Sequence, residues 1–162
     1  TLDWATETKG PGKWGLWRDD PVGTCALWWR WQAGMGQLDG RALGSNFFHQ
    51  VKYEDLVAHP EKELRVIATF LGLSYSDAMA NYYAGKTRHQ AGLSAKKAWL
   101  PPVRNLRDWR QNMSQEDIAV FEGIAGTLLK SNDYECMDVP TSEASAARIS
   151  HCLEWWQSEG RD

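Results

Sequence analysis

The chain has 162 residues, of which 43% are hydrophobic and 24% charged, and this size and composition fit one ordinary domain with its own core. Its net charge of −3 argues against bulk binding to nucleic acid or to an anionic membrane. No apolar run approaches the length of a membrane span, and three scattered cysteines without a CxxC pair favour a reducing, cytoplasmic compartment and exclude zinc-site spacing.

The charge is unevenly distributed along the chain. Residues 1–85 carry 8 basic and 10 acidic side chains, residues 86–111 carry 7 and 1, and residues 112–162 carry 3 and 10. The middle segment is therefore strongly basic within an acidic chain. This pattern predicts a local anion site, with a solvated basic loop as the alternative.

The first elements expected along the chain are an irregular lead-in and a helix. Residues 1–22 are rich in Gly, Pro, Asp and Trp without a sustained period, which is typical of a loop. Residues 24–37 (TCALWWRWQAGMGQ) predict a helix that ends at Gly34 or Gly36. The side chains expected on one face are Leu27, Trp28 and Trp31. The tryptophan clusters of this chain favour core or interface packing, with sugar stacking as the alternative.

A short apolar and aromatic run, FFHQVKY, follows at residues 47–53. Its length and its polar boundaries predict a buried parallel strand. The acids Glu54 and Asp55 come directly after it, and we expect them to fix the turn and the start of the next helix.

The next helix has the clearest sequence signals in the chain. Pro60 stands where the first helical residue should be, acids fill the first turn, and apolar residues recur at helical spacing up to Leu71. Gly72 supplies a left-handed stop. A strand followed by a helix is half of a βαβ unit, so these elements predict an α/β class.

Three further helices are expected. They cover residues 77–84, residues 114–130 with a capping box from Ser114 to Asp117, and residues 142–158. The buried face of the second is expected to hold Ile118, Phe121, Ala125 and Leu128. The apolar face of the third is expected to hold Ile149, Cys152, Leu153 and Trp156.

The number of strands does not suffice for a doubly wound domain, which needs several parallel strands to bury its sheet. Only residues 47–53 read as a strand with clear signals. Either the protein is mostly helical and lends one strand to another sheet, or the chain is the carboxyl-terminal part of a larger domain.

Four short motifs occur in a characteristic order: YEDLV at Tyr53–Val57, FLGL at Phe70–Leu73, DWR at Asp108–Arg110, and YE at Tyr134–Glu135. In this order and spacing they resemble the second half of a bacterial-type sulfotransferase. The resemblance implies an α/β fold, the carboxyl-terminal portion of a P-loop-like sulfotransferase fold, mostly helical with one parallel strand. It also implies transfer of a sulfuryl group from 3′-phosphoadenosine 5′-phosphosulfate (PAPS), without a metal, to a hydroxyl or amine on a small-molecule, carbohydrate or lipid acceptor.

The resemblance also implies a nucleotide-binding role for four residues. Tyr53 would lie beside the adenine of PAPS, and packing of its ring under the following helix is the alternative. Arg104, Arg107 and Arg110 lie in a stretch, VRNLRDWRQ, that resembles the loop over the nucleotide 3′-phosphate. A guanidinium fork matches phosphate geometry and stays charged.

This stretch departs from the pattern of the eukaryotic cytosolic members, which is Arg-Lys-Gly, two residues, then Gly-Asp-Trp-Lys. Pro102 and Val103 occupy the Arg-Lys positions here, and Arg107 replaces the second glycine. The match is to the bacterial variant, and Arg107 is the least supported of the three arginines.

The family's phosphosulfate-binding loop and its usual general base lie near the amino terminus, and no counterpart is found in this chain. The Gly-rich stretch GPGKWG at residues 10–15 lacks the leading glycine and has Trp14 after the lysine. We therefore expect residues 1–135 to be a partial sulfotransferase domain without a complete catalytic site, and residues 136–162 a tail whose tryptophans could join subunits. The alternative is a non-enzymatic, Trp-rich module that binds a glycan or a partner.

Overall fold

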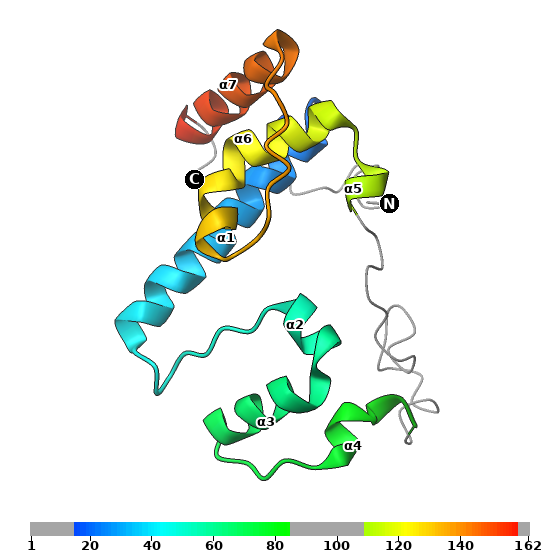
Figure 1. Ribbon diagram of the computed structural model, residues 1–162. Coiled ribbons are helices and arrows are strands. Elements are labelled where there is room, and N and C mark those ends of the chain that lie inside the picture. Colours follow the sequence, from blue (N-terminus) through cyan, green and yellow to red (C-terminus); the bar gives the residue numbers. More distant parts are fainter. Residues whose placement is uncertain (1–14, 85–108, 159–162) are drawn as a thin grey trace. The chain divides into compact units, whose positions relative to one another are not determined.

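The computed structural model describes residues 15–84 and 109–158, and the described residues form helices without a strand (Figure 1). They divide into two compact units, one containing residues 15–39 and 109–158 (unit 1) and the other residues 40–84 (unit 2). The elements are η2 Gly15–Arg18, α1 Pro21–Leu43, α2 Tyr53–Ala58, α3 Pro60–Phe70, α4 Asp77–Ala80, η3 Tyr82–Ala84, α5 Trp109–Asn112, α6 Gln115–Ser131 and α7 Glu143–Ser158. Within these ranges no helix is long and apolar enough to cross a membrane.

The expected parallel strand at residues 47–53 is wrong, and with it the expected α/β, P-loop-like fold. Phe48 packs against Gly40 in the last turn of α1, and the His49 ring lies 5.4 Å from the Phe70 ring of α3. The backbone at Lys52 is extended, but the described residues offer it no strand to pair with. Because a strand needs the backbone groups of a neighbour, this aromatic run is a connector that packs on helices instead.

α1 is longer at both ends than the sequence predicts. It begins at Pro21, where the Asp20 carboxylate accepts a hydrogen bond from the Gly23 N–H at 2.8 Å, an N-cap that the Asp-Pro pair could have indicated. It continues through both glycines expected to end it and stops before Gly44, which adopts a left-handed φ of 84°. Tertiary packing here overrides the weak helix propensity of glycine.

The helix expected after Pro60 is confirmed, and so is its stop. α3 has Pro60 in its first turn, and Gly72 has a φ of 68°. The Leu73 N–H donates to the Ala68 carbonyl at 2.8 Å, and the Gly72 N–H donates to the Thr69 carbonyl at 3.1 Å. These two bonds form a Schellman motif, which satisfies carbonyls at the helix end.

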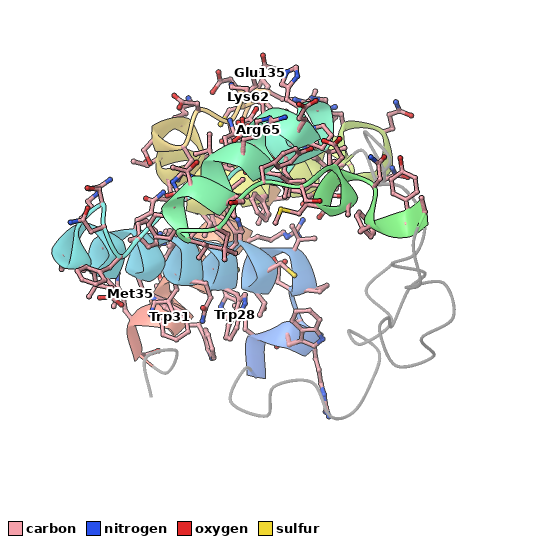
Figure 2. The ribbon with its side chains drawn as sticks, turned by 90° about the horizontal axis from the view of Figure 1, so that it is seen from below. Trp28, Trp31, Met35, Lys62, Arg65 and Glu135 are labelled. Atoms are coloured by element: carbon pink, nitrogen blue, oxygen red, sulfur yellow. The ribbon has the colours of Figure 1, made fainter. Side chains whose placement is uncertain are left out.

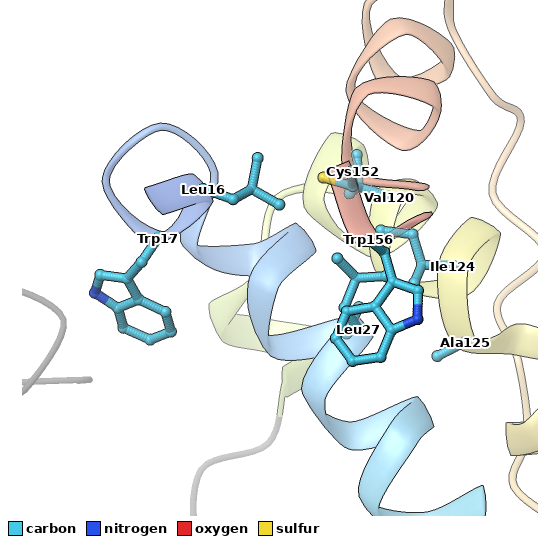
Figure 3. Close-up of a cluster of buried hydrophobic side chains, with 9 residues drawn as sticks. Leu16, Trp17, Leu27, Val120, Ile124, Ala125, Cys152 and Trp156 are labelled. Atoms are coloured by element: carbon cyan, nitrogen blue, oxygen red, sulfur yellow. The ribbon is translucent and has the colours of Figure 1, made fainter. Parts of the chain in front are cut away.

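The core of unit 1 joins α1, α6 and α7 (Figure 3). Its buried members are Leu16, Trp17, Ala26, Leu27, Val120, Ile124, Ala125, Cys152 and Trp156. The expected cap of α6 is confirmed, since the Asp117 N–H donates to the Ser114 hydroxyl at 3.1 Å. Trp156 is 9% exposed and Trp155 packs against the same core, so the tail helix covers the chain's own apolar surface.

A charged cluster at one end of this core ties the three helices together. The Arg148 guanidinium on α7 bonds both carboxylate oxygens of Asp20, at 2.8 and 3.0 Å, and the Asp117 carboxylate at 3.0 Å. Glu116 lies 3.4 Å from the same guanidinium. Arg148 thus links the starts of α1 and α6, where the acids also face positive helix ends.

The Asp20 carboxylate gives unit 1 a predictable response to acid. Burial raises the pKa of Asp20, but hydrogen bonds from Arg148 and the Gly23 N–H, with the charge of Arg148, outweigh burial and hold it below the usual 3.8. Its stabilising effect is therefore complete above about pH 4 and is lost as the pH falls through the lower folded value. We expect Asp20→Asn to be less stable than wild type at pH 7 and to approach wild type as the pH falls below 3.

This expectation can be measured by urea unfolding at pH 7, 4 and 2.5. The matched control is Asp39→Asn, which changes an exposed carboxylate on α1 of the same unit. The lowered pKa of Asp20 would be contradicted if the free energies of unfolding of Asp20→Asn and wild type differed as much at pH 2.5 as at pH 7.

Candidate functional site

Tyr53 is the first residue of α2, directly after the extended backbone of Lys52, and it is 60% exposed. It does not pack under the following helix, because the ring is open to solvent over most of its surface. Glu54 and Asp55 lie in the first turn of α2, where negative charge is favoured by the helix dipole. The acids thus stand at a helix start as expected, although the helix is α2, which the sequence analysis did not identify.

Several other charged and aromatic groups of unit 2 contact one another. The Arg65 guanidinium lies 4.0 Å from the centre of the Tyr75 ring and 2.7 Å from the Glu61 carboxylate. Lys62, one residue after Glu61, points to solvent with 75% of its side chain exposed. Figure 2 shows Lys62 and Arg65 on α3. Phe47 and Tyr53 are the most exposed aromatic side chains among the described residues of this unit, at 75% and 60%, and an open ring can stack on a flat base.

Arg110 lies in α5 of unit 1, and its guanidinium stacks 4.7 Å from the centre of the Trp109 ring. It forms a long 3.5 Å ion pair with Glu135, whose side chain is 88% exposed. An ion pair of this length between exposed side chains stabilises little. Arg104 and Arg107 lie outside the described residues.

Cys25 and Cys152 do not have the character of reactive nucleophiles. Burial, followed by the charge of Asp20, raises the pKa of Cys152 to about 11, and burial raises the pKa of Cys25. Both thiols therefore stay protonated at neutral pH. Over residues 15–84 and 109–158, no three His, Cys, Asp or Glu side chains gather into a possible metal site.

Part of the chain is similar to a known protein family. Residues 11–77 match a model of the sulfotransferase family. The chain therefore carries a sulfotransferase-family segment. The match confirms the resemblance to the sulfotransferase family over these residues. A search of the solved structures finds no match.

The sulfotransferase-family segment contains α1, α2 and α3, and with them Tyr53. It includes two of the four motifs, Tyr53–Val57 and Phe70–Leu73, while Asp108–Arg110 and Tyr134–Glu135 lie beyond its end. Tyr53 and Arg110 also belong to different units. The family match therefore covers Tyr53 but not Arg110.

Proposed function

We propose that this chain is part of a PAPS-dependent sulfotransferase and supplies the adenine and 3′-phosphate side of the cofactor site. The observation that carries the proposal is the sulfotransferase-family match over residues 11–77, which contains an exposed tyrosine at a position that the motif resemblance assigns to the adenine. No residue of this chain is proposed as catalytic.

The residues fit the chemistry of such a ligand. The Tyr53 ring is accessible, and base stacking on an aromatic ring requires an open face. The Arg110 guanidinium is held by Trp109 and only weakly by Glu135, and a guanidinium binds phosphate through two parallel hydrogen bonds. We propose that Arg104 and Arg107 add charge around the same 3′-phosphate.

Sulfuryl transfer depends on holding the donor and the acceptor in line and on positive charge around the transferred group. The groups of this chain would contribute to the first requirement by fixing the nucleotide. The acceptor is proposed to be a hydroxyl or amine of a small molecule, carbohydrate or lipid.

Isothermal titration with 3′-phosphoadenosine 5′-phosphate tests the proposal on the full chain. We expect saturable binding that weakens about 10-fold in Tyr53→Ala, from lost stacking, and about 10-fold or more in Arg110→Ala, from a lost charged hydrogen bond. The matched controls are Tyr82→Ala and Arg65→Ala, which remove an exposed tyrosine and an exposed arginine elsewhere. They should bind like wild type.

Two outcomes would contradict the proposal: no nucleotide binding by wild type, or the same affinity in all four variants and wild type. Titration with oligosaccharides tests the alternative, in which the chain is a non-enzymatic module that binds a glycan. The observation that favours this alternative is the exposure of Trp28 and Trp31, at 45% and 42%, because open indole faces can stack on sugars. Sugar binding without nucleotide binding would select it.

A further inference from the structure

The side chain of Glu135 lies against Arg110, the described arginine of the proposed phosphate site. Its carboxylate oxygen Oε2 is 3.5 Å from Nη2 of the guanidinium, and both residues belong to unit 1. The Glu135 side chain (Figure 2) is 88% exposed and that of Arg110 is 48% exposed. An anionic group of the chain itself therefore contacts the guanidinium that is proposed to bind an anionic ligand.

The Arg110 guanidinium offers its hydrogen bonds in a defined plane. Its central carbon lies 4.7 Å from the centre of the Trp109 ring, so the indole covers part of the guanidinium. The N–H groups of a guanidinium lie in its plane, and carboxylates and phosphates both bind them there. Glu135 approaches one of the terminal nitrogens. A carboxylate and a phosphate thus use the same kind of donor on this side chain.

The turn that ends α6 keeps the carboxylate close to Arg110. In this turn the Tyr134 N–H donates to the Leu129 carbonyl at 3.0 Å, as in a Schellman motif. The Tyr134 ring lies 6.4 Å from the Trp29 ring of α1, at an angle of 78° between the rings. Glu135 is the next residue, so its backbone position is set by these contacts. Its effect on a ligand of Arg110 is intramolecular and is present at every ligand concentration.

The pair between Arg110 and Glu135 differs from the one at Arg148. Arg148 bonds both carboxylate oxygens of Asp20, at 2.8 and 3.0 Å, and the Asp20 side chain is 7% exposed. The Glu135 carboxylate lies at the longer distance of 3.5 Å and is open to water, which weakens its attraction to the guanidinium. Glu135 therefore adds little to the stability of unit 1.

We propose that Glu135 lowers the affinity of the chain for the nucleotide by competing with the 3′-phosphate for Arg110. This inference rests on the proposed function, which assigns Arg110 to that phosphate. When the phosphate binds, the carboxylate must leave the guanidinium or share it, and the two negative groups repel each other. PAPS and the nucleotide product both carry the 3′-phosphate, so Glu135 weakens the binding of both and speeds release of the product.

Isothermal titration of the full chain with 3′-phosphoadenosine 5′-phosphate tests this role. Glu135→Gln keeps the shape of the side chain and removes its charge. It should bind the nucleotide about 3- to 5-fold more tightly than wild type at about 0.15 M salt, because repulsion between exposed charges is modest and screened. The matched control is Glu154→Gln, which removes another exposed carboxylate of unit 1 and changes the net charge equally. It should bind like wild type.

Two further titrations separate competition at Arg110 from a general effect of charge. In the Arg110→Ala background, Glu135→Gln should leave the affinity unchanged, because no guanidinium remains to compete for. Adenosine 5′-phosphate, which lacks the 3′-phosphate, should bind equally to Glu135→Gln and to wild type.

The outcomes distinguish the role of Glu135 from the proposed function. If Arg110→Ala weakens nucleotide binding but Glu135→Gln does not tighten it, the role of Glu135 is overturned and the proposed function stands. A gain in affinity that persists with adenosine 5′-phosphate, or in the Arg110→Ala background, also overturns that role. If neither wild type nor Glu135→Gln binds the nucleotide, both proposals fail. Binding by Glu135→Gln alone would support the role of Glu135.

Discussion

Replacement of Arg148 by Met should lower the free energy of unfolding of unit 1 by about 2 to 3 kcal/mol. The Asp20 side chain is 7% exposed and the Arg148 side chain 29% exposed, so the pair is largely shielded from water. Removing one partner leaves a buried carboxylate without its counter-charge, which costs about 3 to 5 kcal/mol for a fully buried pair and less for one partly open to solvent. Loss of the bonds to Glu116 and Asp117 acts in the same direction.

The measurement is urea unfolding at pH 7, followed by tryptophan fluorescence, because the tryptophans among the described residues all lie in unit 1. The matched control is Arg65→Met. Arg65 also bonds a carboxylate, that of Glu61, but the two side chains are 55% and 64% exposed, so we expect no resolvable change. If Arg148→Met and Arg65→Met lost the same free energy of unfolding, the charged cluster around Arg148 would be no more stabilising than an ion pair at the surface.

The sequence predicts those elements of the fold whose signals are local. Pro60 and Gly72 mark the two ends of α3, and Ser114 marks the start of α6, because a cap or a left-handed glycine acts on backbone groups within a few residues. The tail helix is predicted for a related reason, since the recurrence of its apolar residues reflects its buried face.

The features that were wrong or missed depend on distant residues. The run at residues 47–53 has strand composition, but whether it pairs depends on a neighbouring strand, and the described residues provide helices instead. α1 passes Gly34, where Leu128 of α6 lies beside it, and continues through Gly36 to Leu43. The Arg148 and Asp20 pair spans 128 residues of sequence, a separation at which no local pattern carries information.

In the candidate site, the motif Tyr53–Val57 indicates Tyr53 as a candidate residue. The structure adds that Tyr53 is exposed at the start of a helix. Arg110 is identified by its place in the basic segment, which does not reveal its stacking on Trp109 or its pair with Glu135. The order and spacing of the motifs predict which side chains have suitable chemistry for the site. The contacts that orient them arise only after folding.

Replacement of Trp156 by Ala should lower the free energy of unfolding of unit 1 by about 3 to 4 kcal/mol. Trp156 is 9% exposed, lies in the core cluster with Leu27 and Ile124, and contacts Trp31. Truncation of a buried tryptophan removes its transfer free energy and leaves a cavity that the neighbouring helices fill only in part. Because Trp156 belongs to α7, the effect measures how far the tail helix stabilises the helices before it.

Trp28→Ala is the matched control, since it removes the same side chain from α1 of the same unit, where it is 45% exposed. It should lose much less stability than Trp156→Ala. Urea unfolding followed by circular dichroism separates the two variants. A small loss in Trp156→Ala would mean that α7 is a dispensable tail on an independently stable pair of helices, whereas a large loss means that α1, α6 and α7 unfold together, because one indole fills the space that all three share.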